Sequence, residues 1–77
     1  RWLSAPSIEG AATPEAVAET VALARRAGAQ RIDVLDSADH ALERMHDAPT
    51  YPGFEFESVR ATKFLWGDIV IRRYVAA

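Results

Sequence analysis

The clearest hydrophobic pattern of the chain lies within residues 15–27, where apolar side chains recur at the spacing of one helix face. This stripe consists of Val17, Val21 and Ala24. Thr13 is a favourable N-cap, and Pro14 suits the first helical position because no amide hydrogen is needed there. Gly28 is typical of a helix C-terminus, since glycine accepts the left-handed conformation. We predict a helix that begins at the Thr13 cap and ends before Gly28.

A short strand and a second helix are predicted next. Residues 31–35 read Arg-Ile-Asp-Val-Leu, an apolar run of strand length. Asp36 or Ser37 can cap a helix, and the residues after them place apolar side chains on one helical stripe. The members of that stripe are Ala38, Ala41, Leu42 and Met45. We expect this helix to end before Pro49, which cannot continue it.

The last third of the chain changes to a period of two. Residues 54–57 alternate aromatic and acidic side chains, which indicates a half-buried strand. The alternation slips after Phe56, so we predict a β-bulge near Ser58. Residues 69–75 form a second apolar run, and the glycine of residues 66–68 favours a turn before it. Together these segments predict an antiparallel C-terminal hairpin.

Residues 2–5 could supply an additional edge strand, and residues 7–13 read as a loop around Gly10. The expected element order is therefore (β)-α-β-α-β-β. This order predicts an α/β chain of the two-layer α+β type, with a mixed sheet and both helices on one face. We expect one small domain over residues 1–77, which is either a whole protein or part of a longer one. The other face of the sheet has no helix to cover it.

Composition limits the possible functions. The chain has 77 residues, no cysteine and a formal net charge of −2, so it has no disulfide or thiolate metal site and no overall attraction to nucleic acid. Domains of this size bury only about 60% of the surface of the unfolded chain, which favours oligomerisation as a source of stability. No signal peptide or membrane-spanning stretch is visible, so we expect a cytoplasmic protein. Lys63 is the only lysine among nine basic residues, a bias typical of GC-rich bacteria.

The second predicted helix carries a weak candidate for chemistry. His40 and Glu43 are three residues apart, and Asp47 lies one turn further along the same face. These side chains could form a divalent-metal or acid–base site, but a solvated acidic helix face explains them as well. No phosphate-binding glycine motif or nucleophile elbow is present. We assign no catalytic residue, metal ligand or cofactor, and a small enzyme or metal-binding subunit with a site between chains stays an alternative.

The C-terminal hairpin is locally basic. Arg60, Lys63, Arg72 and Arg73 stand close to aromatic residues, a combination found in nucleic-acid-binding domains. Three acidic residues share the same hairpin, namely Glu55, Glu57 and Asp68. A mixed-charge sheet surface is therefore the preferred interpretation, and nucleic-acid binding is the second hypothesis.

The tip of the hairpin is the most informative feature of the sequence. Phe64, Leu65 and Trp66 are three large apolar residues beside a turn. They either fold back over the core or contact another chain, and the small core together with the uncovered sheet face favours a partner. Our leading hypothesis is a non-catalytic oligomerisation or protein-interaction module that acts through the hairpin and the open sheet face. The predicted interface consists of Phe64, Leu65, Trp66 and Tyr74 as anchors, with Arg72 and Arg73 at the rim.

Overall fold

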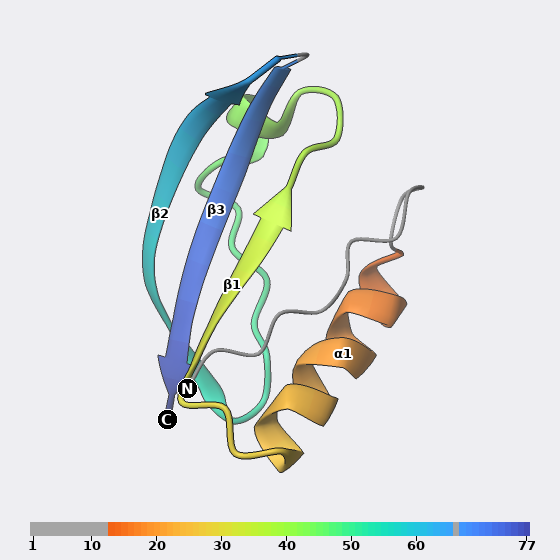
Figure 1. Ribbon diagram of the computed structural model, residues 1–77, viewed down its shortest axis with the longest axis vertical. Coiled ribbons are helices and arrows are strands. Elements are labelled where there is room, and N and C mark those ends of the chain that lie inside the picture. The colour runs from red at the N-terminus through yellow and green to blue at the C-terminus, as the bar shows by residue number, and fades with distance from the viewer. Residues whose placement is uncertain (1–12, 66) are drawn as a thin grey trace.

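The computed structural model describes residues 13–65 and 67–77 of the chain (Figure 1). These residues form one helix, a short 3₁₀ turn and three strands. In chain order they are α1 (Pro14–Arg26), β1 (Arg31–Asp36), η1 (Ala41–Arg44), β2 (Phe54–Phe64) and β3 (Gly67–Ala76). The predicted strand at residues 2–5 and the loop at residues 7–12 lie outside the described residues.

Helix α1 confirms the prediction for the first helix at both ends. The Thr13 hydroxyl accepts a hydrogen bond from the Ala16 amide at 3.1 Å, so it caps one of the free donors of the first turn. At the other end Gly28 adopts a positive φ of 87°, and its amide donates to the Arg25 carbonyl at 3.1 Å. The chain thus leaves the helix and enters β1 after a tight turn.

The three strands form a sheet in the order β1-β3-β2, and both hydrogen-bonded pairs are antiparallel. The prediction of a mixed sheet is therefore wrong. β1 and β2 do run in the same direction, but β3 lies between them and pairs with each. Because β3 follows β2 through a tight hairpin and also pairs with β1, the two strands of equal direction are not neighbours.

The second predicted helix is wrong, because residues 37–48 contain only the 3₁₀ turn η1. His40 has left-handed backbone angles, φ 63° and ψ 26°, which interrupt any α-helix at that point. The Asp36 carboxylate accepts a hydrogen bond from the Ala38 amide at 3.2 Å, which favours a turn over a helix. Arg44 in turn donates to the Asp39 carbonyl at 2.8 Å, so local polar contacts replace the helical ladder.

The hairpin of β2 and β3 confirms the predicted pairing and the predicted bulge. The register shifts between Phe56 and Ser58, where the bulge was expected. Both strands are longer than the sequence indicated, and they pair up to Phe64 and Gly67 at the tip. The hairpin therefore contains the two longest strands in the described part of the chain, with 11 residues in β2 and 10 in β3.

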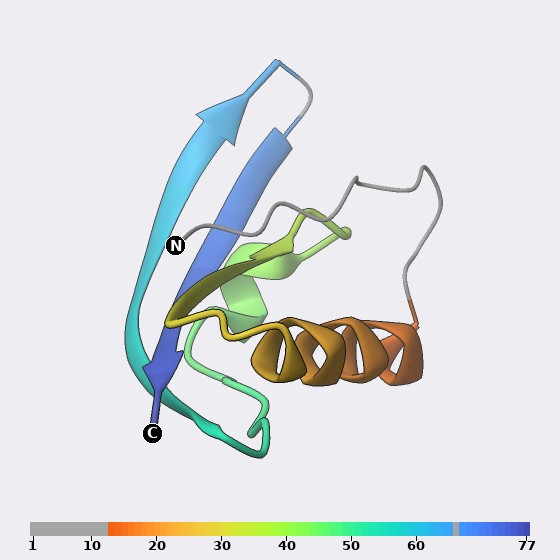
Figure 2. The same ribbon diagram turned by 60° about the horizontal axis from the view of Figure 1, so that its bottom comes forward.

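One face of the sheet carries the core. Figure 2 shows α1 and η1 on the same side of the strands, so the described helices cover one face only. The core cluster consists of Val21, Ala29, Ile32, Tyr51, Phe54 and Tyr74. Tyr74 is 1% exposed, and its ring packs edge-on against Tyr51 with the centroids 5.0 Å apart. Its hydroxyl donates a hydrogen bond to the Pro49 carbonyl at 2.7 Å, which satisfies this buried donor.

The described residues therefore form a small α+β unit with a C-terminal hairpin, one covered sheet face and one face that no described helix covers. Over residues 13–65 and 67–77 there is no helix with the length and apolar character needed to cross a bilayer.

Candidate interaction surface

The strand register shows which side chains share the face opposite α1. Ile32 and Tyr74 are paired and buried on the core face, so residues one position away point to the other side. We call this other side the open face. It carries Asp33 and Leu35 from β1, Glu55, Arg60, Thr62 and Phe64 from β2, and Ile69, Ile71, Arg73 and Val75 from β3.

The open face is apolar toward the hairpin tip. Leu35 lies opposite Ile71 in the register and is 60% exposed. Phe64, at the end of β2, is 55% exposed, and Leu65 beyond it is 91% exposed. Ile69 and Ile71 are partly buried between these exposed side chains. We call these five residues the tip patch: Leu35, Phe64, Leu65, Ile69 and Ile71.

The residues predicted as interface anchors lie partly on the surface and partly in the core. Phe64 and Leu65 belong to the tip patch, and the position predicted for Trp66 lies outside the described residues. Tyr74 is in the core, so it contacts its own chain and is not on the surface. Arg72 is 4% exposed on the same core face, because residues 72 and 74 are two positions apart on one strand.

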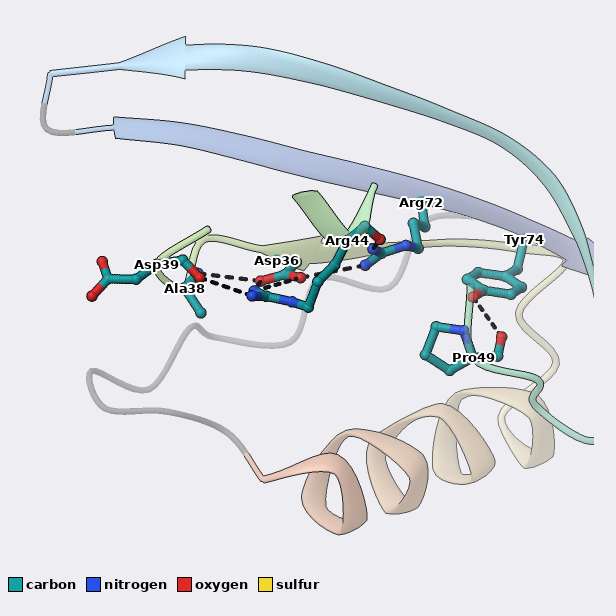
Figure 3. Close-up of polar contacts among 7 residues, drawn as sticks. All are labelled: Asp36, Ala38, Asp39, Arg44, Pro49, Arg72 and Tyr74. Atoms are coloured by element: carbon teal, nitrogen blue, oxygen red, sulfur yellow. Dashed lines mark hydrogen bonds and ion pairs between the residues drawn. The ribbon is translucent and has the colours of Figure 1, made fainter. Parts of the chain in front are cut away.

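Arg72 is held by an ion network beneath the sheet (Figure 3). Its guanidinium lies 3.6 Å from the Asp36 carboxylate and donates to the Arg44 carbonyl. Asp36 also binds the Arg44 guanidinium, with the nearest nitrogen and oxygen 3.1 Å apart. The network joins the end of β1, the turn η1 and the middle of β3, which fixes the segment that was expected to be a helix. Arg72 Nε is buried without a hydrogen-bond partner in the described structure.

Arg73 points to the open face, where it is paired with Asp33. The guanidinium makes two hydrogen bonds to the carboxylate, at 3.0 and 3.3 Å. The hydrogen bond to Asp33 raises the pKa of Arg73, and the charges of Asp33 and Glu57 add to this effect. Much of the positive charge of Arg73 is therefore balanced within the chain.

The residues of the nucleic-acid hypothesis do not lie on one surface. Arg60 and Arg73 are on the open face, whereas Lys63 and Arg72 belong to the core face. Arg72 is buried and Arg73 is paired with Asp33. Of these four residues only Arg60 and Lys63 have exposed side chains outside such a pair, and these two lie on opposite faces of the sheet. A phosphate-binding stripe needs several cations along one groove or face, and this arrangement does not supply it.

The residues of the metal alternative are brought together only in part. His40 Nδ1 lies 3.4 Å from the Glu43 carboxylate, and both side chains are exposed. In the part of the chain that the structure describes, no three histidine or carboxylate side chains gather closely enough to hold a metal ion. Asp47 therefore does not complete a site with His40 and Glu43.

No protein-family model, curated protein or solved structure matches this chain. The surface itself is therefore the basis for a functional proposal. The sequence pattern predicts the apolar hairpin tip but not the contribution of Leu35, Ile69 and Ile71. The signal for these residues was the run of consecutive apolar residues within β1 and within β3, because consecutive positions of a strand point to opposite faces and such a run therefore places apolar side chains on both.

Proposed function

We propose that this chain is a non-catalytic interaction module that binds a protein chain through the tip patch and the β2–β3 hairpin. The observation that supports it is the exposure of large apolar side chains on a face that no described helix covers. Monomeric soluble proteins seldom leave such groups together in water, and contiguous apolar patches are typical of interaction sites. The rim of the patch includes Arg60, and arginine is enriched at interfaces.

Two nearly equally exposed leucines allow a matched test. Leu35 is 60% exposed in the tip patch, and Leu23 is 58% exposed on α1, on the opposite side of the sheet. Loss of one buried leucine contact weakens binding by about tenfold or more. We expect Leu35→Ser and Leu65→Ser each to raise the dissociation constant of the complex by that factor, while Leu23→Ser leaves it unchanged.

Self-association is measured first, by sedimentation velocity over a wide range of protein concentration. The tagged chain and the same three variants are then used to capture partners from cell lysate. Binding that is lost with both tip-patch variants but kept with Leu23→Ser supports the proposal. A strict monomer that also captures no protein in a manner dependent on Leu35 or Leu65 refutes it.

A further inference from the structure

The outer edge of β2 has the properties of a self-complementary strand. β2 is an edge strand of the described sheet, and its 11 residues are almost all exposed. Outward-pointing amide and carbonyl groups of an edge strand can pair with another strand. The acidic residues Glu55 and Glu57 occupy its first half, and the basic residues Arg60 and Lys63 occupy its second half. An antiparallel copy of the same strand would bring the acidic half of each chain beside the basic half of the other.

We infer that the partner is a second copy of this chain, paired antiparallel along β2 about a two-fold axis at Val59. This inference rests on the proposed function and names its partner. The bulge sets Glu57 and Ser58 together against one position of the neighbouring strand. With the axis at Val59, Glu57 of each chain then lies opposite Arg60 of the other, so the complementary pair forms twice.

The apolar residues on the core face of β2 would also meet one another in this antiparallel pairing. Phe56, Val59 and Ala61 lie on the core face of β2, opposite Tyr74, Arg72 and Val70 in the register. Phe56 is 46% exposed, although its ring contacts Tyr74 edge-on with the centroids 5.7 Å apart. In the proposed dimer Val59 meets Val59 of the second copy, and Phe56 meets Ala61. Charged pairs therefore form on one face of the joined sheet and apolar pairs on the other.

The charges also select this register. If the axis moves one position toward the N-terminus, Glu57 meets Glu57 of the second copy. If it moves one position toward the C-terminus, Arg60 meets Arg60. Like charges directly opposite each other destabilise strand pairing, whereas opposite charges stabilise it. The axis at Val59 also places each hairpin tip beside the turn before Phe54 of the other copy, so Phe64 and Leu65 of the tip patch reach the partner, whereas Leu35 lies on β1 at the opposite edge of the sheet.

The test reverses the charge of Glu57 and the charge of Arg60 in two separate variants. Glu57→Arg gives a chain with two positive residues at this site, and Arg60→Glu gives one with two negative residues. We expect each variant alone to dimerise at least about tenfold more weakly than the natural chain, as measured by sedimentation velocity. A mixture of the two variants forms the complementary pairs again, and so does a chain that carries both substitutions. Both preparations should regain natural affinity, and salt should weaken it.

The control pair is Glu19→Arg and Arg26→Glu, two exposed positions of α1 with the same change of charge. Far-UV circular dichroism confirms that each variant is folded. Dimerisation that the control pair leaves unchanged, and that mixing restores for Glu57→Arg and Arg60→Glu, supports the inference. Dimers that respond to Leu35→Ser but not to the β2 charges overturn this pairing and leave the proposed function intact. A chain that stays monomeric at all concentrations overturns the second copy as the partner.

Discussion

Replacing Asp36 with alanine removes the carboxylate that balances Arg72 beneath the sheet. In Asp36→Ala the guanidinium of Arg72, which is 4% exposed, loses the oxygen that lies 3.6 Å away. Removing one partner of a buried ion pair costs about 3–5 kcal/mol, because the remaining charge is left in a poorly solvated site. Arg72 still donates to the Arg44 carbonyl, so we expect a loss near the lower limit, about 3 kcal/mol.

The contribution of Arg44 to this loss is small. Its side chain is 41% exposed, and ion pairs at such positions contribute about 1 kcal/mol or less. A chain of this length has a total stability of about 4–12 kcal/mol, so Asp36→Ala stays folded in the absence of denaturant but unfolds at much lower urea concentration. Urea titration followed by far-UV circular dichroism measures this change.

Two further variants make the measurement specific to the buried charge. Asp39→Ala is the control in the same segment, because Arg44 binds the backbone carbonyl of Asp39 and not its side chain. It should change stability by less than about 0.5 kcal/mol. In Asp36→Ala/Arg72→Met no buried charge remains, and at least about 1 kcal/mol should be recovered. A cost of less than about 1 kcal/mol for Asp36→Ala, or a double variant as unstable as the single one, would contradict a buried, unbalanced Arg72 charge as the cause.

Two other predictions concern backbone strain and pH. Gly28→Ala and Gly53→Ala both place a side chain at positive φ, 87° and 86°, but only at Gly53 would the new Cβ meet Arg25, 2.9 Å from Nε. Thermal unfolding should show a loss of about 1–2 kcal/mol at Gly28 and about 1 kcal/mol more at Gly53, and equal losses would contradict this. Burial raises the pKa of Tyr51 and Tyr74 above the ordinary 10.0, so the stability that depends on their neutral form is fully present below about pH 10 and is lost as pH rises through the folded-state pKa. Urea unfolding at rising pH should give a shallower fall for Tyr74→Phe, and an unchanged slope would argue against the tyrosine.

The elements with local signals could be predicted from the sequence. The cap at Thr13, the glycine after α1 and the bulge before Ser58 depend on neighbouring residues, and the structure confirms each of them. The prediction of the second helix was wrong because the Asp36 carboxylate accepts hydrogen bonds from the Ala38 amide and the Arg44 guanidinium. These contacts favour a turn in a segment whose apolar stripe alone indicates a helix. Arg44 would be a solvated residue on such a helix, and only the folded sheet brings it to the Asp36 carboxylate at the end of β1.

The candidate site could be predicted only in part because the alternation in β3 does not distinguish the two faces. Val70 and Tyr74 share one face with Arg72, while Ile69 and Ile71 share the other with Arg73. Each face therefore carries apolar residues and one arginine, and sequence pattern alone gives no reason to bury either arginine. The choice depends on Asp36 and Asp33, which come from the neighbouring strand and neutralise one arginine on each face.

The charged residues of β2 would have two effects: they oppose unspecific pairing of this edge strand, and they favour pairing with a second copy in one register. Charged side chains and bulges on an edge strand normally oppose pairing with other chains. In β2 both features are present, and they disfavour every two-fold register that sets Glu57 or Arg60 against its own copy. They favour the register in which Glu57 meets Arg60, so the same residues would exclude unspecific stacking and specify a closed dimer. A closed two-fold pair uses the β2 edge of both chains, which leaves no free β2 edge from which an open filament could grow.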